Sequence, residues 1–387
     1  MKTTKIIISG GGTGGHIFPA IAIAENLKNK IDGIEILFVG AKGKMEIKKV
    51  PQYGYKIKSI WISGFQRKKI FKNILLPLKI IISFIQAYFI IKKFKPNIVI
   101  GTGGFASAPI LQMAANLKIP TLIQEQNSWP GATNKILAKK VDKICVAYPE
   151  AADVFTRIIM NRVNLSSKLK IDKKYLSQKI VLTGNPVRKE IMFFQNNTIE
   201  ARKYFQLNID NPTILVIGGS LGALTINNAI FKGVHILLNK NIQIIWQTGA
   251  NFYKQASETF NNFDNIKVFQ FINEIDKAYA AADIIIGRAG AISISEFCCV
   301  GKPVILVPSP NVAENHQTKN AEALVKNNAA LMIADNEAPQ KLVNTIISLI
   351  ENDILKKQLA ENIYKLAKPD ATELITNEIF TLINIVK

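Results

Sequence analysis

The residue of this sequence that is best suited to proton transfer is a histidine at the end of a glycine-rich turn. His16 follows five glycines within residues 5–27, KIIISGGGTGGHIFPAIAIAENL. An imidazole titrates near neutral pH, so it can accept a proton from an attacking hydroxyl group. His16 is therefore a candidate general base. Two alternatives stay open, namely that it only helps to bind a pyrophosphate or that it caps a helix.

A strand, a turn and a helix are predicted around His16. The β-branched run at residues 6–8 predicts the strand, and Pro19 is expected to open a helix whose apolar residues recur at helical spacing. Glycines let backbone N–H groups approach an anion, and the positive end of the following helix points to the same place. The turn is therefore predicted to bind a phosphate.

The same turn contains a G-x-G-x-x-G pattern, formed by Gly10, Gly12 and Gly15. Dinucleotide-binding domains that carry this pattern also need an acidic residue at the end of the second strand, about 20 residues further on. Here the second predicted strand, residues 34–39, is followed by Gly-Ala-Lys. The missing acid argues against an NAD-dependent oxidoreductase.

A second cluster of residues that could bind a ligand lies in the other half of the chain, at residues 287–296. A helix that opens at Ala291 would aim backbone N–H groups and Arg288 at a phosphate, and Glu296, one turn in, would accept both hydroxyls of a ribose. The alternative for Glu296 is an ordinary solvated helix residue. This half is predicted to bind a nucleotide.

Alternating strands and helices position these two clusters, a pattern typical of parallel sheets with helices on both faces. A turn signal at residues 184–188 marks the expected domain boundary. We therefore predict an α/β protein with two Rossmann-like domains, residues 1–185 and 186–367, that face each other across a cleft. The polar residues 157–179 are expected to form a surface excursion. The remaining strands are expected at residues 97–100, 121–123, 180–182, 213–217, 242–247, 266–269, 284–286, 304–307 and 330–333.

Composition sets limits on the class of protein. With 387 residues, 48% of them hydrophobic, the chain can form two full cores, and no leader is expected before the first strand. Three cysteines, two of them adjacent, indicate reduced thiols in a cytosolic protein. No C-x-x-C and no H-E-x-x-H occurs, so no dedicated metal site is expected.

The net charge of +21 is concentrated in one region. Residues 47–124 contain thirteen Lys or Arg and no Asp or Glu. One interpretation is a compositional drift towards Lys, Ile and Asn, and the other is a surface that meets an anionic partner.

Within this region, residues 67–95 (RKKIFKNILLPLKIIISFIQAYFIIKKFK) place an apolar segment between basic clusters. Because the segment is short and contains Pro77 and Lys79, we expect a helix pair with an exposed apolar edge, attached to an anionic membrane leaflet rather than spanning it. The alternative is a buried core helix with solvated ends.

The motifs, taken together, resemble those of the GT-B glycosyltransferases, and within them the N-acetylglucosaminyl transferases of peptidoglycan synthesis. The resemblance covers nearly the whole chain. Its motifs are GGGTGGHIFPA (residues 10–20), GTGGFASAP (101–109), EQNSWPGATNK (125–135), GNPVR (184–188), GGSLGA (218–223), FI (271–272), RAGAISISE (288–296) and NHQTKNA (315–321).

The resemblance implies the partners of the protein. The donor would be UDP-N-acetylglucosamine, and the acceptor would be the lipid-linked undecaprenyl-pyrophosphoryl-N-acetylmuramoyl-pentapeptide, used at the cytoplasmic face of the inner membrane. No cofactor, metal or nucleic acid is expected. A last helix, at about residues 368–387, would pack back on the first domain.

The resemblance also implies a set of site residues, with His16 as the catalytic base of an inverting displacement. The helices after Ser220 and Ala291, with Arg288, would stabilise the departing UDP without a metal. The donor is expected to contact Thr13, Gly14, Gly15, Asn127, Arg188, Ser220, Phe271, Ile272, Arg288, Ala291, Ile292, Ser293, Glu296, His316, Gln317 and Asn320. The acceptor pyrophosphate is expected to contact Gly12, Gly14, Gly15, Gly104, Ser107 and Asn134.

This sequence departs from the family pattern at several positions. Gln124 stands where the family usually has His, Leu221 where it often has Gln, and Ile292-Ser293 where it often has Leu-Thr. The first departure removes a rival catalytic histidine. Residues 157–179 also form a longer polar stretch than the family pattern.

Two alternatives from other classes complete the set. A UDP-sugar 2-epimerase shares the two-domain fold, but it needs several carboxylates in the cleft, and the acid-free run argues against it. A non-catalytic lipid carrier would keep the basic apolar edge but has no reason to keep Arg288 and Glu296 together.

Overall fold

The computed structural model describes residues 3–64, 74–165, 173–188, 191, 197–219, 222–312 and 315–383. The chain divides into two compact units. The N-terminal unit consists of Met1–Arg188 together with Pro369–Lys387, and the C-terminal unit consists of Lys189–Lys368.

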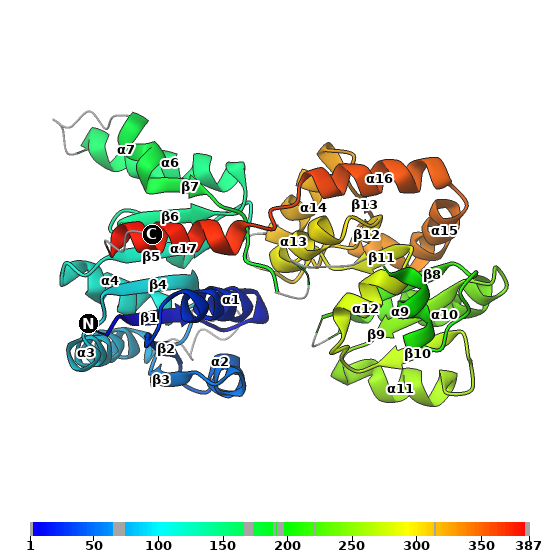
Figure 1. Ribbon diagram of the computed structural model, residues 1–387, viewed down its shortest axis with the longest axis horizontal. Coiled ribbons are helices and arrows are strands. Elements are labelled where there is room, and N and C mark those ends of the chain that lie inside the picture. Colours follow the sequence, from blue (N-terminus) through cyan, green and yellow to red (C-terminus); the bar gives the residue numbers. More distant parts are fainter. Residues whose placement is uncertain are drawn as a thin grey trace. The chain divides into compact units, whose positions relative to one another are not determined.

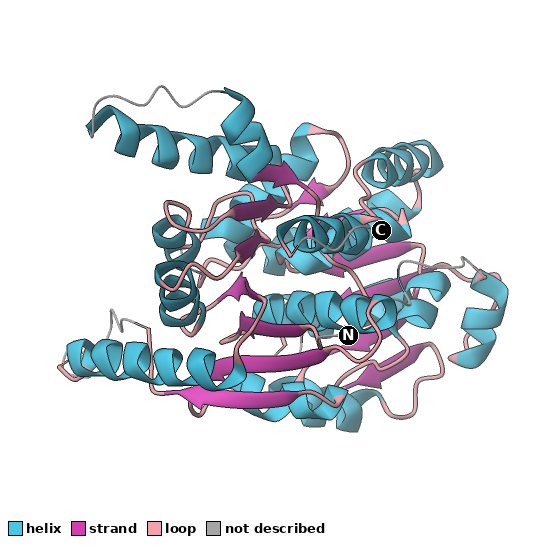
Figure 2. Ribbon diagram, turned by 60° about the vertical axis from the view of Figure 1, so that its left-hand side comes forward, coloured by secondary structure: helices cyan, strands magenta, loops and turns pink. Residues whose placement is uncertain are grey.

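The described strands of the N-terminal unit form one parallel sheet in the order β3-β2-β1-β4-β5-β6-β7 (Figures 1 and 2). The order reverses between β1 and β4, which is where Rossmann-like sheets bind their ligands. The strands are β1 Lys5–Gly10, β2 Glu35–Ala41, β3 Lys56–Ile60, β4 Ile98–Gly103, β5 Thr121–Glu125, β6 Lys143–Val146 and β7 Ile180–Leu182. The helices are α1 Gly14–Lys30, α2 Met45–Lys49, η1 Val50–Tyr53, α3 Leu76–Phe94, α4 Ser107–Asn116, α5 Ala132–Leu137, α6 Pro149–Leu165, α7 Lys173–Lys179 and α17 Ala371–Leu382.

Strand alternation explains how this sheet builds two cores. Ile6 and Ile8 of β1 pack with α1 and α17, whereas Ile7 between them packs with α3, α4 and α6 on the other face. The C-terminal helix α17 is fixed to α1 by a hydrogen bond from Asn26 Nδ2 to Thr376 Oγ1 (2.7 Å). The last helix of the chain therefore belongs to the N-terminal unit.

The described strands of the C-terminal unit repeat the same topology, β10-β9-β8-β11-β12-β13, all parallel. The two sheets confirm the prediction of two Rossmann-like α/β domains. The strands are β8 Thr213–Ile217, β9 Gln243–Gln247, β10 Ile266–Phe269, β11 Ile284–Gly287, β12 Val304–Leu306 and β13 Leu331–Met332. The helices are α9 Thr198–Tyr204, α10 Leu224–Leu238, α11 Ala250–Phe260, α12 Ile275–Ala281, α13 Ala291–Val300, α14 His316–Lys326, η4 Asp335–Glu337, α15 Ala338–Ile350 and α16 Asp353–Lys365.

One local prediction was wrong. Helix α1 begins at Gly14, so that Pro19 lies inside it, where the missing N–H leaves the carbonyl of Gly15 without its usual partner. The polar stretch predicted as a surface excursion is helical over residues 157–165 and again in α7, while residues 166–172 lie outside the described part. Of the helix pair predicted at residues 67–95, the described part contains α3, and residues 65–73 lie outside it, so the pair stays a prediction.

The cysteines agree with the expectation of reduced thiols, because all three are free. Burial raises the pKa of Cys298 to about 12, which makes its thiolate form rare at neutral pH.

Candidate active site

Two glycine turns lie against each other at the switch point of the N-terminal unit. The N–H of Gly11, after β1, donates to the carbonyl of Gly103, at the end of β4 (3.2 Å). A side chain at Gly10 would place its Cβ 1.9 Å from Thr102 Oγ1, and one at Gly104 would lie 2.4 Å from the carbonyl oxygen of Gly11. Glycine is required at both positions, because a Cβ would meet the Thr102 hydroxyl at the first and the backbone of the facing turn at the second.

His16 lies on the first turn of α1, directly beside the second glycine turn. Its Nδ1 is 2.9 Å from Oε1 of Gln126, and its backbone carbonyl accepts a hydrogen bond from Thr102 Oγ1 (2.7 Å). Its ring is so close to Gly103 that a Cβ there would lie 2.8 Å from Nδ1 and Cε1. Three strand ends, those of β1, β4 and β5, therefore fix the position of the imidazole.

The start of α1 offers backbone donors for an anion. Thr13 is the N-cap residue, and no side chain caps the helix. The N–H groups of Gly14 and Gly15 precede the first intrahelical bonds, which run from His16 and Ile17 to the carbonyl of Thr13. These two N–H groups remain consistent with the predicted pyrophosphate contact.

A buried glutamate, which the sequence analysis did not identify, holds the first glycine turn. Glu46 of α2 is 1% exposed and accepts hydrogen bonds from the N–H groups of Gly12 (2.8 Å) and Ala41 (2.9 Å). The N–H of Gly12 is thus used by a carboxylate, and the contact between Gly12 and a pyrophosphate stays a prediction. The sequence signal was its position as the last acid before the acid-free run.

A second buried carboxylate organises the loop after β5. Glu125, 1% exposed, accepts hydrogen bonds from the N–H groups of Asn127 (3.0 Å) and Gly131 (3.0 Å) and from the side-chain amides of Asn127 (3.1 Å) and Asn134 (2.8 Å). The loop that carries the predicted sugar contact Asn127 is thus wrapped around one carboxylate. Charge-assisted hydrogen bonds of this kind are among the stronger ones in proteins.

Two further predicted pyrophosphate ligands have their side-chain donors in use within the N-terminal unit. Asn134 is 3% exposed, and both of its N–H donors are used, by Glu125 and by the carbonyl of Gln124 (3.3 Å). Ser107 is fully buried, and its hydroxyl lies 2.9 Å from the carbonyl oxygens of both Ser9 and Gly103. Both side chains hold loops together and have no free donor for an anion.

The switch point of the C-terminal unit also carries a glycine turn and a helix N-terminus. Gly222 has a φ of 81° and packs so closely that a Cβ would lie 2.3 Å from the carbonyl oxygen of Thr248. Ser220 and Leu221, also singled out in the sequence, lie outside the described residues. Helix α13 follows Gly290 without a side-chain cap, so the N–H groups of Ala291, Ile292 and Ser293 have no intrahelical acceptor.

Arg288 is held beside this helix end by an ion pair. Its Nη1 pairs with Asp335 of η4 and donates to the carbonyl of Val307 (2.9 Å). Asp335 in turn accepts a hydrogen bond from Thr225 Oγ1 (2.9 Å), at the start of α10. Arg288 was predicted from its motif, whereas Asp335 was not, because no motif marks it.

Glu296 is a buried residue, so the alternative of a solvated helix residue is wrong. It is 4% exposed, and its Oε2 accepts a hydrogen bond from the hydroxyl of Tyr279 (3.2 Å). The carboxylate is therefore buried and hydrogen-bonded, about one turn after the N-terminus of α13.

The remaining predicted donor residues divide into exposed and structural ones. Phe271 is 48% exposed, whereas the N–H of Ile272 donates to Gln247 Oε1 (2.9 Å). Gln317 Oε1 accepts a hydrogen bond from the N–H of Ser309 (2.8 Å).

Asn320 is fully buried and donates to the carbonyl of Ala289 (3.3 Å), so it supports the turn that carries Arg288. His316 at the start of α14 and Arg188 are half-buried.

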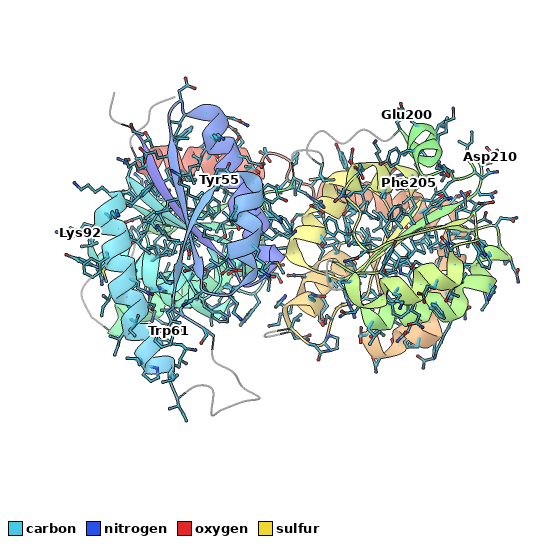
Figure 3. All side chains as sticks on the ribbon, turned by 90° about the horizontal axis from the view of Figure 1, so that it is seen from below. Tyr55, Trp61, Lys92, Glu200, Phe205 and Asp210 are labelled. Carbon is cyan, nitrogen blue, oxygen red and sulfur yellow. The ribbon has the colours of Figure 1, made fainter. Side chains whose placement is uncertain are left out.

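Helix α3 presents an apolar face to solvent. Only Ser83, Ala87 and Ile91 of this helix are buried, so the alternative of a buried core helix is wrong. Lys92, labelled in Figure 3, extends from the basic end of the same helix. Its exposed apolar side chains include Leu78 (47%), Ile81 (58%), Ile85 (51%) and Phe89 (64%). Among the described residues, no helix has the combination of length and hydropathy needed to cross a bilayer.

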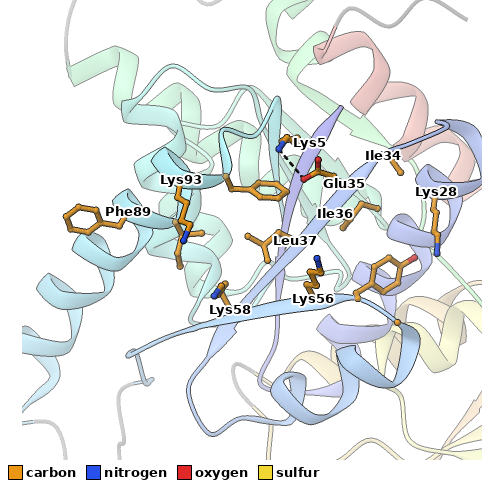
Figure 4. A pocket seen from close by; sticks show the side chains of 14 residues that line it. Lys5, Lys28, Ile34, Glu35, Ile36, Leu37, Lys56, Lys58, Phe89 and Lys93 are labelled. Atoms are coloured by element: carbon orange, nitrogen blue, oxygen red, sulfur yellow. Dashed lines mark ion pairs between the residues drawn. The ribbon is translucent and has the colours of Figure 1, made fainter. Parts of the chain in front are cut away.

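A pocket of about 690 Å³ adjoins the end of α3, at the amino ends of β1, β2 and β3 (Figure 4). Its walls are apolar and include Phe89 and Phe94, and five lysines surround it with one acid, Glu35, which pairs with Lys5 (3.1 Å). The other lysines are Lys28, Lys56, Lys58 and Lys93. This pocket lies at the opposite end of the strands from His16, so it is a separate site.

Two parallel-sheet α/β units, each with a glycine turn and a free helix N-terminus at its switch point, define a GT-B glycosyltransferase. Residues 6–146 match the glycosyltransferase family 28 N-terminal domain, and residues 213–375 match the glycosyltransferase family 28 C-terminal domain. The chain belongs to glycosyltransferase family 28, and within it to the MurG transferases.

Individual relatives agree with this assignment. The chain is 49% identical over 383 residues to the UDP-N-acetylglucosamine–N-acetylmuramyl-(pentapeptide) pyrophosphoryl-undecaprenol N-acetylglucosamine transferase of Cytophaga hutchinsonii, covering 99% of this chain and 98% of the relative. The crystal structure of Acinetobacter baumannii MurG matches with a TM-score of 0.72 at 26% identity, covering 98% and 99% of the two chains. A UDP-GlcNAc 2-epimerase from Neisseria meningitidis, bound to UDP-GlcNAc, shares only the fold (TM-score 0.64, 13% identity, coverage 98% and 100%).

Proposed function

We propose that this protein transfers N-acetylglucosamine from UDP-N-acetylglucosamine to the C4 hydroxyl of undecaprenyl-pyrophosphoryl-N-acetylmuramoyl-pentapeptide. The product is the lipid-linked disaccharide precursor of peptidoglycan. The N-terminal unit binds the lipid-linked acceptor, and the C-terminal unit binds the nucleotide of the donor. The observation that carries the proposal is the placement of His16 on a helix start that offers free N–H groups to an anion.

His16 acts as the general base in this reaction. The acceptor hydroxyl oxygen forms a bond to C1 of the donor sugar while the bond from C1 to the UDP oxygen breaks, which inverts the α-linked donor to a β-linked product. The proton of the hydroxyl moves to the imidazole. A positioned base of this kind contributes about 10²–10⁴-fold to a rate.

The departing UDP is stabilised by the C-terminal unit. The uncapped N-terminus of α13 carries partial positive charge, and Arg288 lies beside it. Arg288 is paired with Asp335, so its net charge is partly balanced, and the backbone N–H groups supply the rest of the stabilisation. Neither contribution requires a metal ion.

The protein works as a peripheral protein on the cytoplasmic face of the inner membrane. The apolar face of α3 and the lysines of the adjoining pocket support this proposal. Apolar side chains enter the interface between headgroups and acyl chains, and each lysine near an anionic leaflet contributes about 1 kcal/mol.

The test of the function is a direct assay. The purified full-length chain is incubated with UDP-N-acetylglucosamine and a short-chain analogue of the lipid acceptor, and the products are separated and weighed by mass spectrometry. We expect a disaccharide product together with UDP. Folded protein that gives no disaccharide would refute the transferase proposal, and epimerised UDP-sugar in the absence of acceptor would favour the epimerase.

A further inference from the structure

We propose that Gln126 is a positioning residue that selects the tautomer of His16, so that Nδ1 carries the proton and Nε2 is left as the base. Its catalytic consequence rests on the proposed function, whereas the tautomer itself does not. The starting observation is the 2.9 Å contact between His16 Nδ1 and Gln126 Oε1.

The orientation of the Gln126 amide is fixed by its other partners. Its nitrogen lies 2.8 Å from the carbonyl oxygen of Thr102 and 3.1 Å from that of Gln124, and it also contacts the side-chain oxygen of Gln124. All three partners are acceptors, so the atom that faces them is the N–H₂ group. The carbonyl oxygen of Gln126 must therefore face His16.

The Gln126 carbonyl oxygen has no proton to donate, so it determines whether Nδ1 of His16 carries a proton. If Nδ1 of His16 were unprotonated, two lone pairs would face each other at 2.9 Å inside the protein, beside an amide that is 1% exposed. The Nδ1–H form is therefore selected, and in neutral imidazole the other nitrogen is then an acceptor. The described part of the chain places no hydrogen-bond partner on Nε2, so this lone pair is available to a substrate hydroxyl.

A chain of buried amides keeps Gln126 from turning over. Gln124 Nε2 donates to Asn185 Oδ1 (2.8 Å), and Asn185 Nδ2 donates to the backbone carbonyl of Gln126 (3.0 Å). Thr102 links the two ends, because its carbonyl accepts from Gln126 and its hydroxyl donates to the His16 carbonyl. The loops after β1, β4, β5 and β7 are thereby joined around one imidazole.

The experiment reads the tautomer directly. The chain contains three histidines, so long-range proton–nitrogen NMR spectra of the ¹⁵N-labelled full-length protein are simple, and His16→Gln assigns the signal. We expect wild-type His16 to be protonated on Nδ1 and bare on Nε2 in its neutral form. In Gln126→Met this preference disappears, and kcat falls by about 10²-fold with the acceptor KM changed less than threefold, since a base in the wrong tautomer is ineffective.

The matched control is Gln124→Met, the same substitution at an equally buried amide of the same network. It leaves Gln126 with two backbone acceptors, so we expect the Nδ1–H tautomer to persist and kcat to fall less than tenfold. A wild-type His16 protonated on Nε2, or equal losses in the two variants, would overturn the proposal. Should Gln126→Met not fold, the wild-type spectrum still decides the tautomer. If no variant and no wild type makes product, the proposed function fails while the spectrum still tests Gln126.

Discussion

The two switch points of this protein are built on the same topology but are held together by different chemistry. In the N-terminal unit, the loops around His16 are joined by neutral amides, and two buried carboxylates, Glu46 and Glu125, accept backbone N–H groups. In the C-terminal unit, the corresponding position carries a cation, Arg288, paired with Asp335. The shared fold supplies free helix N-termini, and the side chains decide which reaction component each end can serve.

This difference indicates a division of labour. A side-chain amide beside an imidazole orients the ring without adding charge, which suits a residue that must take a proton. A guanidinium beside a helix N-terminus suits a leaving group that gains negative charge. Changing one side chain at either switch point should therefore affect one component of the reaction and not the other.

The largest effect is expected from His16→Ala. If the N-terminal switch point supplies the base, kcat should fall by at least about 10²-fold, because a positioned base contributes that much or more. The KM for UDP-N-acetylglucosamine should change little. The control is His235→Ala, which removes an exposed histidine of α10. A His16→Ala variant that keeps more than a tenth of wild-type turnover would end the assignment of His16 as the base.

Glu125→Gln tests whether a buried carboxylate builds the N-terminal site. One of the two oxygens that receive N–H groups would become an N–H₂ group, so donors would face donors. We expect the free energy of unfolding to fall by about 2–3 kcal/mol, the range for an unsatisfied buried group or a lost charged hydrogen bond. Urea denaturation measures this. Glu150→Gln, at an exposed glutamate in the first turn of α6, should leave stability unchanged, and equal curves for the two variants would count against the role of Glu125.

Arg288→Met and Asp335→Asn, taken as a pair, test the C-terminal switch point. Loss of the guanidinium should lower kcat by about tenfold, since Arg288 is proposed to stabilise charge that develops on the departing UDP and a hydrogen bond to a charged group is worth about 1.5–3 kcal/mol. Asp335→Asn keeps the arginine and should lower kcat less than threefold. Steady-state kinetics distinguish an Arg288 that acts on the UDP from one that only forms the ion pair with Asp335. Equal effects of the two substitutions would favour the second role.

The fold was predictable from the sequence where a mainly apolar run is bounded by turn signals. Strands β8 and β10 were expected at their observed residues, because their apolar runs end at clear turn signals. Strands β3 (KIKSI) and β6 (KICV) were not expected. The first is a polar edge strand and the second has four residues, so neither carries a strong apolar pattern, and pairing in the sheet determines both.

The candidate site was predictable only in its local parts. Glycine turns, His16 and Arg288 could be found because a turn and the helix that follows it are adjacent in sequence. The partners that fix them could not, since Glu46, Asp335 and Gln126 lie 34, 47 and 110 residues away from the groups that they hold. For the same reason Ser107 was assigned to a ligand, although its hydroxyl is held by Ser9, 98 residues away.

The smallest effect is expected at the basic pocket beside α3, on the side of the N-terminal unit that we propose to face the membrane. Lys58→Gln removes one exposed cation from the pocket beside α3. Binding to vesicles that contain anionic phospholipid should weaken by about fivefold, the equivalent of about 1 kcal/mol for one cation near such a surface. Cosedimentation measures the binding. Lys254→Gln, on α11 of the other unit, is the control, because its side chain is 87% exposed but lies far along the chain from α3. Equal losses of vesicle binding in the two variants would show that net charge alone drives binding. A loss of binding confined to Lys58→Gln, seen at low salt and absent on neutral vesicles, would show that the N-terminal unit binds the anionic surface.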